Sequence, residues 1–280
     1  MRSDQLSYPP DGPIIPQLDG LSIRTLTKIL RFQTPDLSPR YGWVHEDLVG
    51  EIDGDPFDAY RRLDPDIPLE SVRLLPPTQP GKIICVGRNY EAHARELNNP
   101  LDELPTLFSK PRTSLIGLGD PIILPSQSQQ VQQEAELAVI IGKKGRWIQP
   151  ELAIDYVFGY TIANDVTARD LQERDKQWTR AKGFDTFCPL GPWIETEFDP
   201  SDALITCHVG DELRQMASTR DMLFTVPQLI AFIASIMTLE PGDVILTGTP
   251  AGVGDLMPGV SVSITIEGLG TLTNPVLSEG

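Results

Sequence analysis

The chain has 280 residues, of which 40% are hydrophobic, so it can form a sizeable core and is not a globally disordered protein. Lys and Arg number 23 against 39 Asp and Glu, which gives a formal net charge of −16. This balance argues against nucleic acid, whose phosphates need a positive face, and against an anionic membrane surface. A small anionic substrate is still compatible, because a pocket can be locally positive on an acidic protein.

Cysteine usage and apolar runs indicate the compartment. The three cysteines, Cys85, Cys188 and Cys207, are odd in number and form no CxxC pair, which favours a reducing compartment over a disulfide framework. No apolar run reaches the roughly 18 residues of a membrane span. The first twenty residues lack the basic start and apolar core of a signal peptide. We therefore expect a cytoplasmic protein.

The N-terminal part of the chain divides into an arm and a small unit. Residues 1–21 hold four prolines within the first sixteen positions, and we expect an extended arm there. Residues 22–78 are predicted to form a small β-rich domain, because turn residues separate segments that suit strands. These strand segments are 23–30, 41–48 and 69–75. A Pro- and Gly-rich linker at 76–81 precedes a larger domain, which we place at 79–280.

The larger domain alternates short apolar runs with turns. Helices are predicted at 91–97 and 226–237, with Pro227 in the first turn of the second helix. Strands are predicted at 82–86, around 108, and at 121–124, 136–141, 157–162, 204–209, 244–247 and 260–266. Many strands and few helices indicate an α+β domain that is mostly β.

Two glutamates in an apolar segment, Glu134 and Glu136, are the first sign of chemistry. In a strand they point to the same face, where like charges repel unless a cation lies between them. Asp165 ends another apolar strand and would complete an all-oxygen site that suits Mg²⁺, Mn²⁺ or Ca²⁺. From the spacing alone, two surface acids on a solvent-facing strand edge are the favoured interpretation.

Seven stretches between residues 82 and 254 form an ordered set of motifs. They are KIICVGRNYEAH, LFSKP, IGLGDPI, EAELAV, GYTIANDVTARDLQ, KGFDTFCP and GDVILTGTPAGVG. Together they resemble the fumarylacetoacetate hydrolase family, in its short, acylpyruvase-like branch. The resemblance implies a β-sandwich-like roll, usually dimeric, with Mg²⁺ or Mn²⁺ held on Glu134, Glu136 and Asp165. It also implies a small anionic 2-oxo acid as substrate.

The same resemblance implies roles for other matched positions. His93 and Glu96, three residues apart on the predicted helix, correspond to a base that activates water and an acid that orients it. Without the resemblance they would be interpreted as an incidental surface pair. Lys182 corresponds to a group that stabilises a developing oxyanion. Substrate binding is assigned to four further residues, namely Lys110, Arg169, Gln172 and Thr249.

These assignments predict a divalent-metal-dependent hydrolase that cleaves a C–C bond in a 2,4-dioxo acid, such as an acylpyruvate or fumarylpyruvate, through an enolate. The same residues leave two alternatives open. One is the decarboxylation of oxaloacetate, and the other is the isomerisation or decarboxylation of a 2-hydroxymuconate-type diacid in aromatic catabolism. A binding protein without activity is a different class, which loss of the three carboxylates or of the His–Glu pair would have indicated. We expect a homodimer, by resemblance only.

Overall fold

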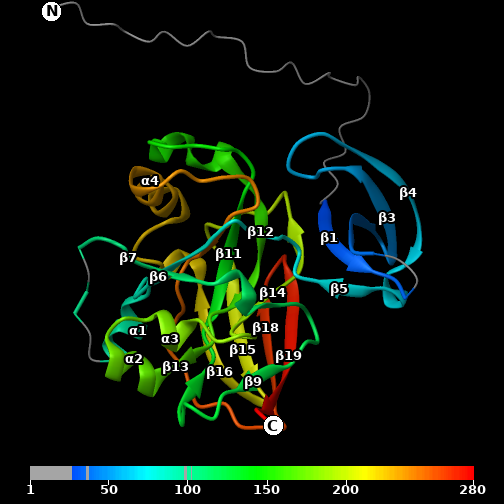
Figure 1. The fold of residues 1–280 in the computed structure, drawn as a ribbon. Helices are drawn as coiled ribbons and strands as arrows, with labels where there is room; N and C mark the ends of the chain where they lie inside the picture. Colours follow the sequence, from blue (N-terminus) through cyan, green and yellow to red (C-terminus); the bar gives the residue numbers. More distant parts are fainter. Residues whose placement is uncertain (1–26, 36–37, 98–99, 102) are drawn as a thin grey trace, which may run out of the picture.

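The computed structural model describes residues 27–280 apart from 36–37, 98–99 and 102. The arm expected at residues 1–21 lies outside this part of the chain. Figure 1 shows a small β-rich part, made by the first strands, beside a larger part that carries the labelled helices. The predicted α+β class, mostly β, is therefore confirmed.

The small part is an antiparallel meander. Its strands are β1 (Lys28–Gln33), β2 (Arg40–His45), β3 (Leu48–Gly54), β4 (Tyr60–Pro68) and β5 (Arg73–Leu75). Strand β1 pairs with β2 and β5, and the order continues through β3 to β4 at the edge. Leu30, Phe32 and Val49 form its own cluster of buried apolar residues, and Trp193 of the larger part packs against them. This core is small, so the meander depends on the larger part for further burial.

The meander continues without a break into the main sheet of the larger part. Lys28 pairs with Glu195 and Ile29 with Ile194, so β1 lies directly beside β14. The order is β4-β3-β2-β1-β14-β12-β11-β17-β6-β7, and β8 also pairs with β14. The strands of the larger part are β6 (Ile83–Gly87), β7 (Thr106–Lys110), β8 (Leu115–Ile116), β11 (Ala135–Ile141), β12 (Val157–Asn164), β14 (Cys188–Glu195) and β17 (Val244–Leu246).

A second sheet covers one face of the first. Its order is β16-β15-β18-β19-β9. The bounds are β9 (Ile122–Leu124), β15 (Leu204–Val209), β16 (Glu212–Ser218), β18 (Ser261–Ile266) and β19 (Gly270–Ser278). The largest core cluster joins Leu137 and Ile162 of the main sheet to Ile205, Ile264 and Leu272 of the second. The main core therefore lies between two packed sheets, as in a sandwich.

Short helices close the two ends of this sandwich. In Figure 1, α1 (Glu91–Glu96), α2 (Arg169–Asp175) and α3 (Thr179–Lys182) gather at one end, and α4 (Val226–Ile236) lies at the other. Helix α4 begins as expected, with Pro227 in its first turn. The remaining short elements are β10 (Val131–Gln132), β13 (Thr167–Ala168), η1 (Leu69–Ser71), η2 (Arg112–Ser114), η3 (Pro150–Tyr156) and η4 (Thr219–Asp221).

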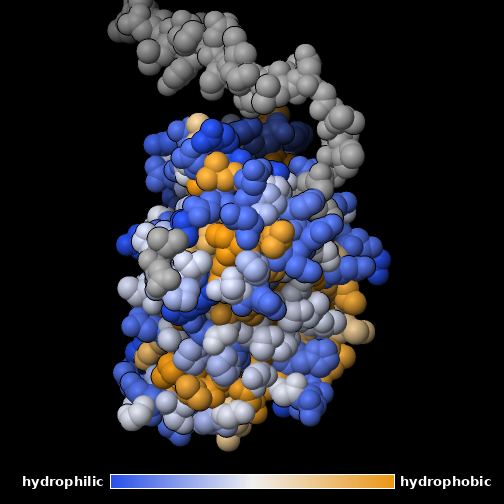
Figure 2. Space-filling view, turned by 90° about the vertical axis from the view of Figure 1, so that its right-hand side faces the viewer, coloured by the Kyte–Doolittle hydropathy of each residue, from blue (hydrophilic) through white to orange (hydrophobic). Residues whose placement is uncertain are grey.

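Figure 2 shows the face on the right-hand side of Figure 1. Hydrophilic residues cover much of it, in keeping with the net charge of −16, and apolar residues form separate patches between them. The three cysteines are buried and unpaired. Within the described residues, none of the helices combines the length and apolarity that crossing a membrane requires. The expected homodimer stays a prediction.

Candidate metal and substrate site

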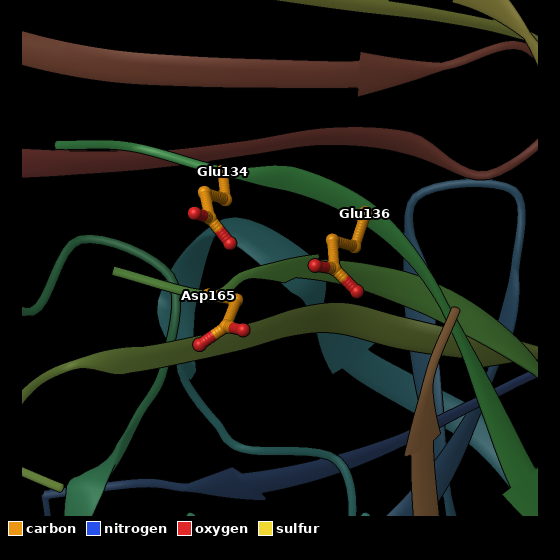
Figure 3. Close-up of side chains that lie close together, drawn as sticks. All are labelled: Glu134, Glu136 and Asp165. Atoms are coloured by element: carbon orange, nitrogen blue, oxygen red, sulfur yellow. The ribbon is translucent and has the colours of Figure 1, made fainter. Parts of the chain in front are cut away.

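Three carboxylates meet where β11 begins and β12 ends. Glu136 lies on β11, Glu134 directly precedes that strand, and Asp165 directly follows β12. The antiparallel register places Ala135 opposite Asn164, which brings the two strand ends together. Each carboxylate offers an oxygen, and these oxygens lie within 4.8 Å of one another (Figure 3). The alternation of side chains along β11 therefore directs both glutamates toward the same point as Asp165.

Backbone contacts hold this arrangement rigidly. The side-chain oxygen of Asn164 accepts a hydrogen bond of 3.0 Å from the backbone N–H of Glu134. The backbone N–H of Asp165 donates to the carbonyl of Glu134 at 2.9 Å. Because Asn164 and Asp165 are both fully buried, these bonds form in a setting of low dielectric. The three carboxylates therefore have little freedom to move apart.

Buried cations compensate two of the three carboxylates. The Lys182 ammonium lies 2.7 Å from Glu134 and 2.6 Å from Asp165. Lys110 lies 2.7 Å from Asp165, and Arg169 lies 2.5 Å from Glu134. Glu136 accepts a hydrogen bond of 2.7 Å from the backbone N–H of Gly248. Within the described part of the chain, it takes part in none of the ion pairs.

The pKa values follow this uneven compensation. Burial raises the pKa of Glu136 well above its ordinary value, and the neighbouring charges of Asp165 and Glu134 raise it further. Burial acts in the same direction on Glu134, but Lys182 and Arg169 outweigh it and hold that pKa well below its usual range. For Lys182, burial is outweighed by Asp165 and Glu134, which raise the pKa. The site thus carries one carboxyl group that lacks a cation.

A divalent cation fits this set of donors. The three ligands are all oxygen, which suits Mg²⁺, Mn²⁺ or Ca²⁺ better than zinc. Burial and the like charges of Asp165 and Glu134 raise the pKa of Glu136, and a bound cation would lower it again. The geometry is therefore consistent with the predicted metal site on Glu134, Glu136 and Asp165.

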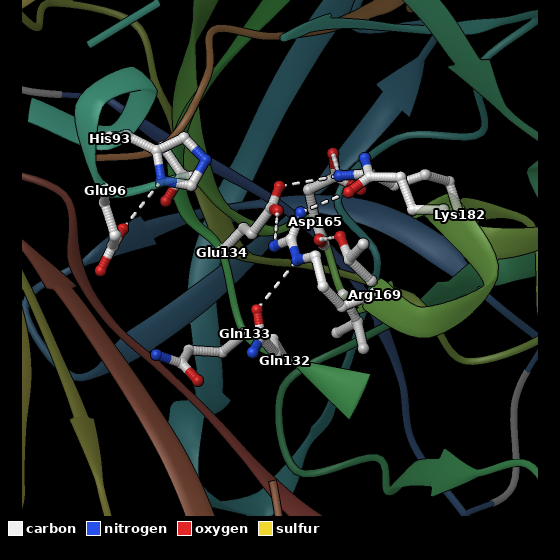
Figure 4. Close-up of polar contacts among 12 residues, drawn as sticks. His93, Glu96, Gln132, Gln133, Glu134, Asp165, Arg169 and Lys182 are labelled. Atoms are coloured by element: carbon white, nitrogen blue, oxygen red, sulfur yellow. Dashed lines mark hydrogen bonds and ion pairs between the residues drawn. The ribbon is translucent and has the colours of Figure 1, made fainter. Parts of the chain in front are cut away.

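The His–Glu pair lies beside the carboxylates. His93 and Glu96 are on α1, and Nδ1 of His93 lies 3.1 Å from Oε2 of Glu96. The other carboxylate oxygen accepts a hydrogen bond of 3.0 Å from the backbone N–H of Gly252. Burial would raise the pKa of Glu96, but the bonds from His93 and Gly252 lower it overall. In Figure 4 the imidazole lies between Glu96 and Glu134.

A small cavity connects these groups, and the volume in it that is open to a water-sized probe is about 40 Å³. This is room for a few water molecules. Arg88, Leu97, Phe108 and Trp178 form part of its wall. The predicted site residues that line it are His93, Glu134, Glu136, Arg169, Gln172, Lys182 and Thr249.

Several predicted substrate ligands are already engaged with the carboxylate cluster. Arg169 donates to Glu134, to Gln132 at 2.9 Å and to Gln172 at 2.5 Å, so its guanidinium orients Glu134 (Figure 4). Lys110 lies behind Asp165, outside the set of residues that line the cavity. The Thr249 hydroxyl donates to the carbonyl of Ala135 at 2.9 Å. The substrate-binding roles of Lys110, Arg169 and Thr249 stay predictions.

Two buried amides that sequence reasoning missed support the site. Asn89 donates to the carbonyls of Thr247 and Phe224 at 2.7 and 3.0 Å, which fixes the turn before α1. Gln215 of β16 contacts both Ala135 and Thr249. Asn89 lies inside the GRNY motif, which was the available signal. Gln215 lies in a polar segment outside every motif, so nothing in the local pattern marked it.

Comparison with known proteins agrees with the fold. Residues 82–277 match the family model described as fumarylacetoacetate (FAA) hydrolase, C-terminal, and residues 27–77 match the model described as Rv2993c-like, N-terminal. The chain is 45% identical over 226 residues to oxaloacetate tautomerase FAHD2B, mitochondrial, of Bos taurus, which covers 76% of this chain and 72% of that protein.

Two solved structures are also similar. The 2-hydroxyhepta-2,4-diene-1,7-dioate isomerase from Mycobacterium marinum has a TM-score of 0.84 and 43% identity, covering 91% of this chain and 99% of that one. Maleylpyruvate hydrolase from Sphingobium sp. SYK-6, in complex with manganese(II) and pyruvate, has a TM-score of 0.75 and 32% identity, with 90% and 100% covered. The chain therefore belongs to the fumarylacetoacetate hydrolase family.

Proposed function

We propose that this protein is an enzyme that interconverts the keto and enol forms of oxaloacetate or of a closely similar 2-oxo dicarboxylic acid. The observation that carries this proposal is the position of His93, whose buried imidazole lines the same cavity as Glu134, Glu136 and Lys182. Keto–enol interconversion needs a base beside the carbon that loses a proton and a positive group beside the oxygen that gains charge. The similarity to oxaloacetate tautomerase FAHD2B and to the M. marinum isomerase supports it.

The ionisation of Glu96 assigns the proton positions on His93. With its lowered pKa, the Glu96 carboxylate is ionised at neutral pH and can only accept hydrogen bonds. Nδ1 of His93 therefore carries the hydrogen, and Nε2 is the basic atom. In the proposed reaction Nε2 removes a proton from C3 of the keto acid. His93 then transfers this proton to the C2 oxygen, which gives the enol. The reverse sequence restores the keto form.

The other cavity residues bind and stabilise charge. A divalent cation on Glu134, Glu136 and Asp165 would polarise the 2-oxo group of the substrate. Lys182 supplies a buried ammonium for the oxygen that becomes negative. The side-chain oxygen of Gln172 accepts from Arg169, so its amide nitrogen is the atom that can donate to a substrate carboxylate.

The charge of the buried groups favours a dianionic substrate. Three carboxylates face three cations in this cluster, and the two sets balance; they are Glu134, Glu136 and Asp165 against Lys110, Arg169 and Lys182. A divalent cation would leave two positive charges. Because uncompensated charge in a buried site is costly, this positive charge favours a dianion such as oxaloacetate over a monoanionic acylpyruvate.

Hydrolysis of a C–C bond in a 2,4-dioxo acid is the second candidate. The same His93 could deprotonate a water molecule, which would then attack the distal carbonyl and release an enolate. The similarity to maleylpyruvate hydrolase supports this reading, at the lower identity of 32%. Decarboxylation of oxaloacetate would also pass through an enolate. It removes no proton from water or from C3, so it gives His93 no role as a base.

Two substrates separate these reactions. Metal-loaded protein is mixed with the enol form of oxaloacetate, and the ultraviolet absorbance of the enol and the release of pyruvate are followed with and without EDTA. Acetylpyruvate is tested in parallel. The proposal predicts EDTA-sensitive loss of the enol without pyruvate release, and no such loss with the His93→Gln variant. EDTA-sensitive pyruvate from acetylpyruvate would establish the hydrolase instead, and pyruvate from oxaloacetate would establish the decarboxylase.

A further inference from the structure

One buried amide from the second sheet joins two parts of the site. Gln215 lies on β16 and is fully buried. Its side-chain oxygen accepts a hydrogen bond of 3.1 Å from the backbone N–H of Ala135. Its side-chain nitrogen donates to the hydroxyl of Thr249 and to the carbonyl of Pro250, both at 2.8 Å. The amide therefore uses its acceptor on one chain segment and its donors on another.

Both segments carry groups of the site. Ala135 lies between Glu134 and Glu136, so its peptide determines where the two carboxylates begin. Thr249 follows Gly248, whose N–H donates to Glu136. Because an amide group is planar and rigid, Gln215 sets the spacing between the carboxylate strand and this turn. Gln215 itself lies outside the residues that line the cavity.

The neighbouring residue of β16 extends the same support to the His–Glu pair. The carbonyl of Arg214 approaches Gly252 so closely that a Cβ there would lie 1.9 Å from its oxygen. Gly252 has a φ of +102° and donates its N–H to Glu96, the partner of His93. One strand of the second sheet thus contacts the turn that holds the orienting acid.

We propose that Gln215 is a positioning residue, which holds Glu134 and Glu136 in register with the turn at 248–252 and so sets the affinity for the divalent cation. This inference rests on the proposed function only where it concerns the effect of Gln215 on turnover. Cation binding is measured without substrate and tests it separately. Residues that orient metal ligands without touching the metal typically change its affinity by roughly 10–100-fold when substituted.

The test compares Gln215→Met with a matched control. Methionine has a similar shape but lacks the donors and the acceptor. Asn274→Leu is the control, because Asn274 is buried in the same sheet and donates to the carbonyls of Gly117 and Asp120 at 2.7 and 2.8 Å, away from the site. Titration with Mn²⁺, followed by electron paramagnetic resonance, gives the Kd, and the Tm is measured for each variant.

We expect Q215M to raise the Kd for Mn²⁺ roughly tenfold and N274L to leave it within about twofold, even where their Tm values fall equally. Equal Mn²⁺ affinity in Q215M and the wild type would overturn the inference, as would an equal loss in N274L. If Q215M does not fold, Gln215→Asn gives the same comparison, since its shorter amide cannot reach both segments. Wild type that binds Mn²⁺ more tightly than Q215M but leaves oxaloacetate unchanged would reject the proposed function and keep this inference.

Discussion

At the scale of a single residue, the buried carboxyl group of Glu136 lowers the stability of the metal-free protein and would serve as a ligand for a cation. Its carboxyl is buried, its pKa is raised by burial and by Asp165 and Glu134, and it pairs with none of the described cations. The variant Glu136→Gln keeps the shape and removes the ionisable group. We expect metal-free E136Q to be more stable than metal-free wild type at neutral pH, by on the order of 1 kcal/mol. Calorimetry without metal measures this difference.

The pH dependence of that difference has a defined sign. An acid whose pKa is raised on folding binds more protons in the folded state, so its effect is to lower stability as pH rises above its ordinary value near 4.5. The gap between E136Q and the wild type should therefore widen from pH 5 upward. Added Mn²⁺ should raise the Tm of the wild type and leave that of E136Q unchanged. A gap that narrows with rising pH would contradict this account of Glu136.

The orienting role of Glu96 gives a second prediction. Glu96→Gln replaces the acceptor of two hydrogen bonds, one from His93 and one from Gly252, with an amide whose nitrogen cannot accept. We expect kcat to fall about 100-fold with Mn²⁺ affinity unchanged, because Glu96 is not among the three clustered carboxylates. Glu91→Gln is the control, since Glu91 pairs with Arg95 on the exposed side of the same helix. A similar fall in both variants would reject a specific role for Glu96.

Individual residues also show how far the sequence alone can lead. The convergence of Glu134 and Glu136 followed from the alternation of a strand, and Asp165 from a motif at a strand end. The sequence did not predict which groups the long cationic side chains contact. Arg169 orients Glu134, and Lys110 lies behind Asp165, because a buried carboxylate is a stronger partner for a cation than an open cavity. Local sequence does not show such competition.

At the scale of elements, the turn at 248–252 depends on a glycine. Gly252 has a φ of +102°, and a Cβ would collide with the carbonyl of Arg214. We expect Gly252→Ala to destabilise the fold by about 3 kcal/mol and to lower kcat, since the N–H that Glu96 uses must shift. The Tm and kcat of the variant test this expectation.

Gly259 provides the matched control for this turn. Its φ is +90°, but nothing lies within 4 Å of the place of its Cβ. Gly259→Ala therefore adds only the backbone strain of about 1–2 kcal/mol and should leave kcat unchanged. Equal effects on kcat in the two variants would show that backbone strain, and not the contact with Arg214, governs activity.

Element prediction was accurate for the apolar runs of the larger part and failed for polar or proline-containing strands. In the small part, the strand predicted at 41–48 was wrong, because a turn at residues 46–47 divides it between β2 and β3. The segments at 136–141, 157–162 and 204–209 all lie in strands. The helix predicted at 226–237 corresponds to α4. Strand β4 is almost wholly exposed, so it lacks an apolar face. Strand β14 contains two prolines, and β16 is rich in polar residues. Their pairing is determined by neighbours distant in sequence, which no local pattern records.

At the scale of the whole molecule, the small part is an extension of the main sheet. Its strand β1 pairs with β14, and Ile29 shares a core cluster with Leu190 and Ile194 of that strand. Deleting residues 1–77 removes this pairing and exposes an apolar strand edge. We expect the truncated chain to aggregate or to melt at least several degrees lower, as seen by size-exclusion chromatography and thermal denaturation.

A shorter deletion is the control for that experiment. Removing residues 1–21 leaves the pairing of β1 with β14 in place and should preserve the Tm. A chain lacking residues 1–77 that is monodisperse and melts like the full-length protein would contradict the structural role of β1. The limits of the two domains at residues 78 and 79 stay a prediction, because the sheet itself runs across them.

In the proposed reaction His93 transfers a proton at C3 of a 2-oxo diacid. The most direct measurement starts from enol oxaloacetate in D₂O with metal-loaded protein, while malate dehydrogenase and NADH trap the keto product as malate. We expect accelerated trapping with deuterium on one face of C3, and loss of both effects in His93→Gln. Deuterium spread equally over both faces, at the rate seen without the protein, would contradict it.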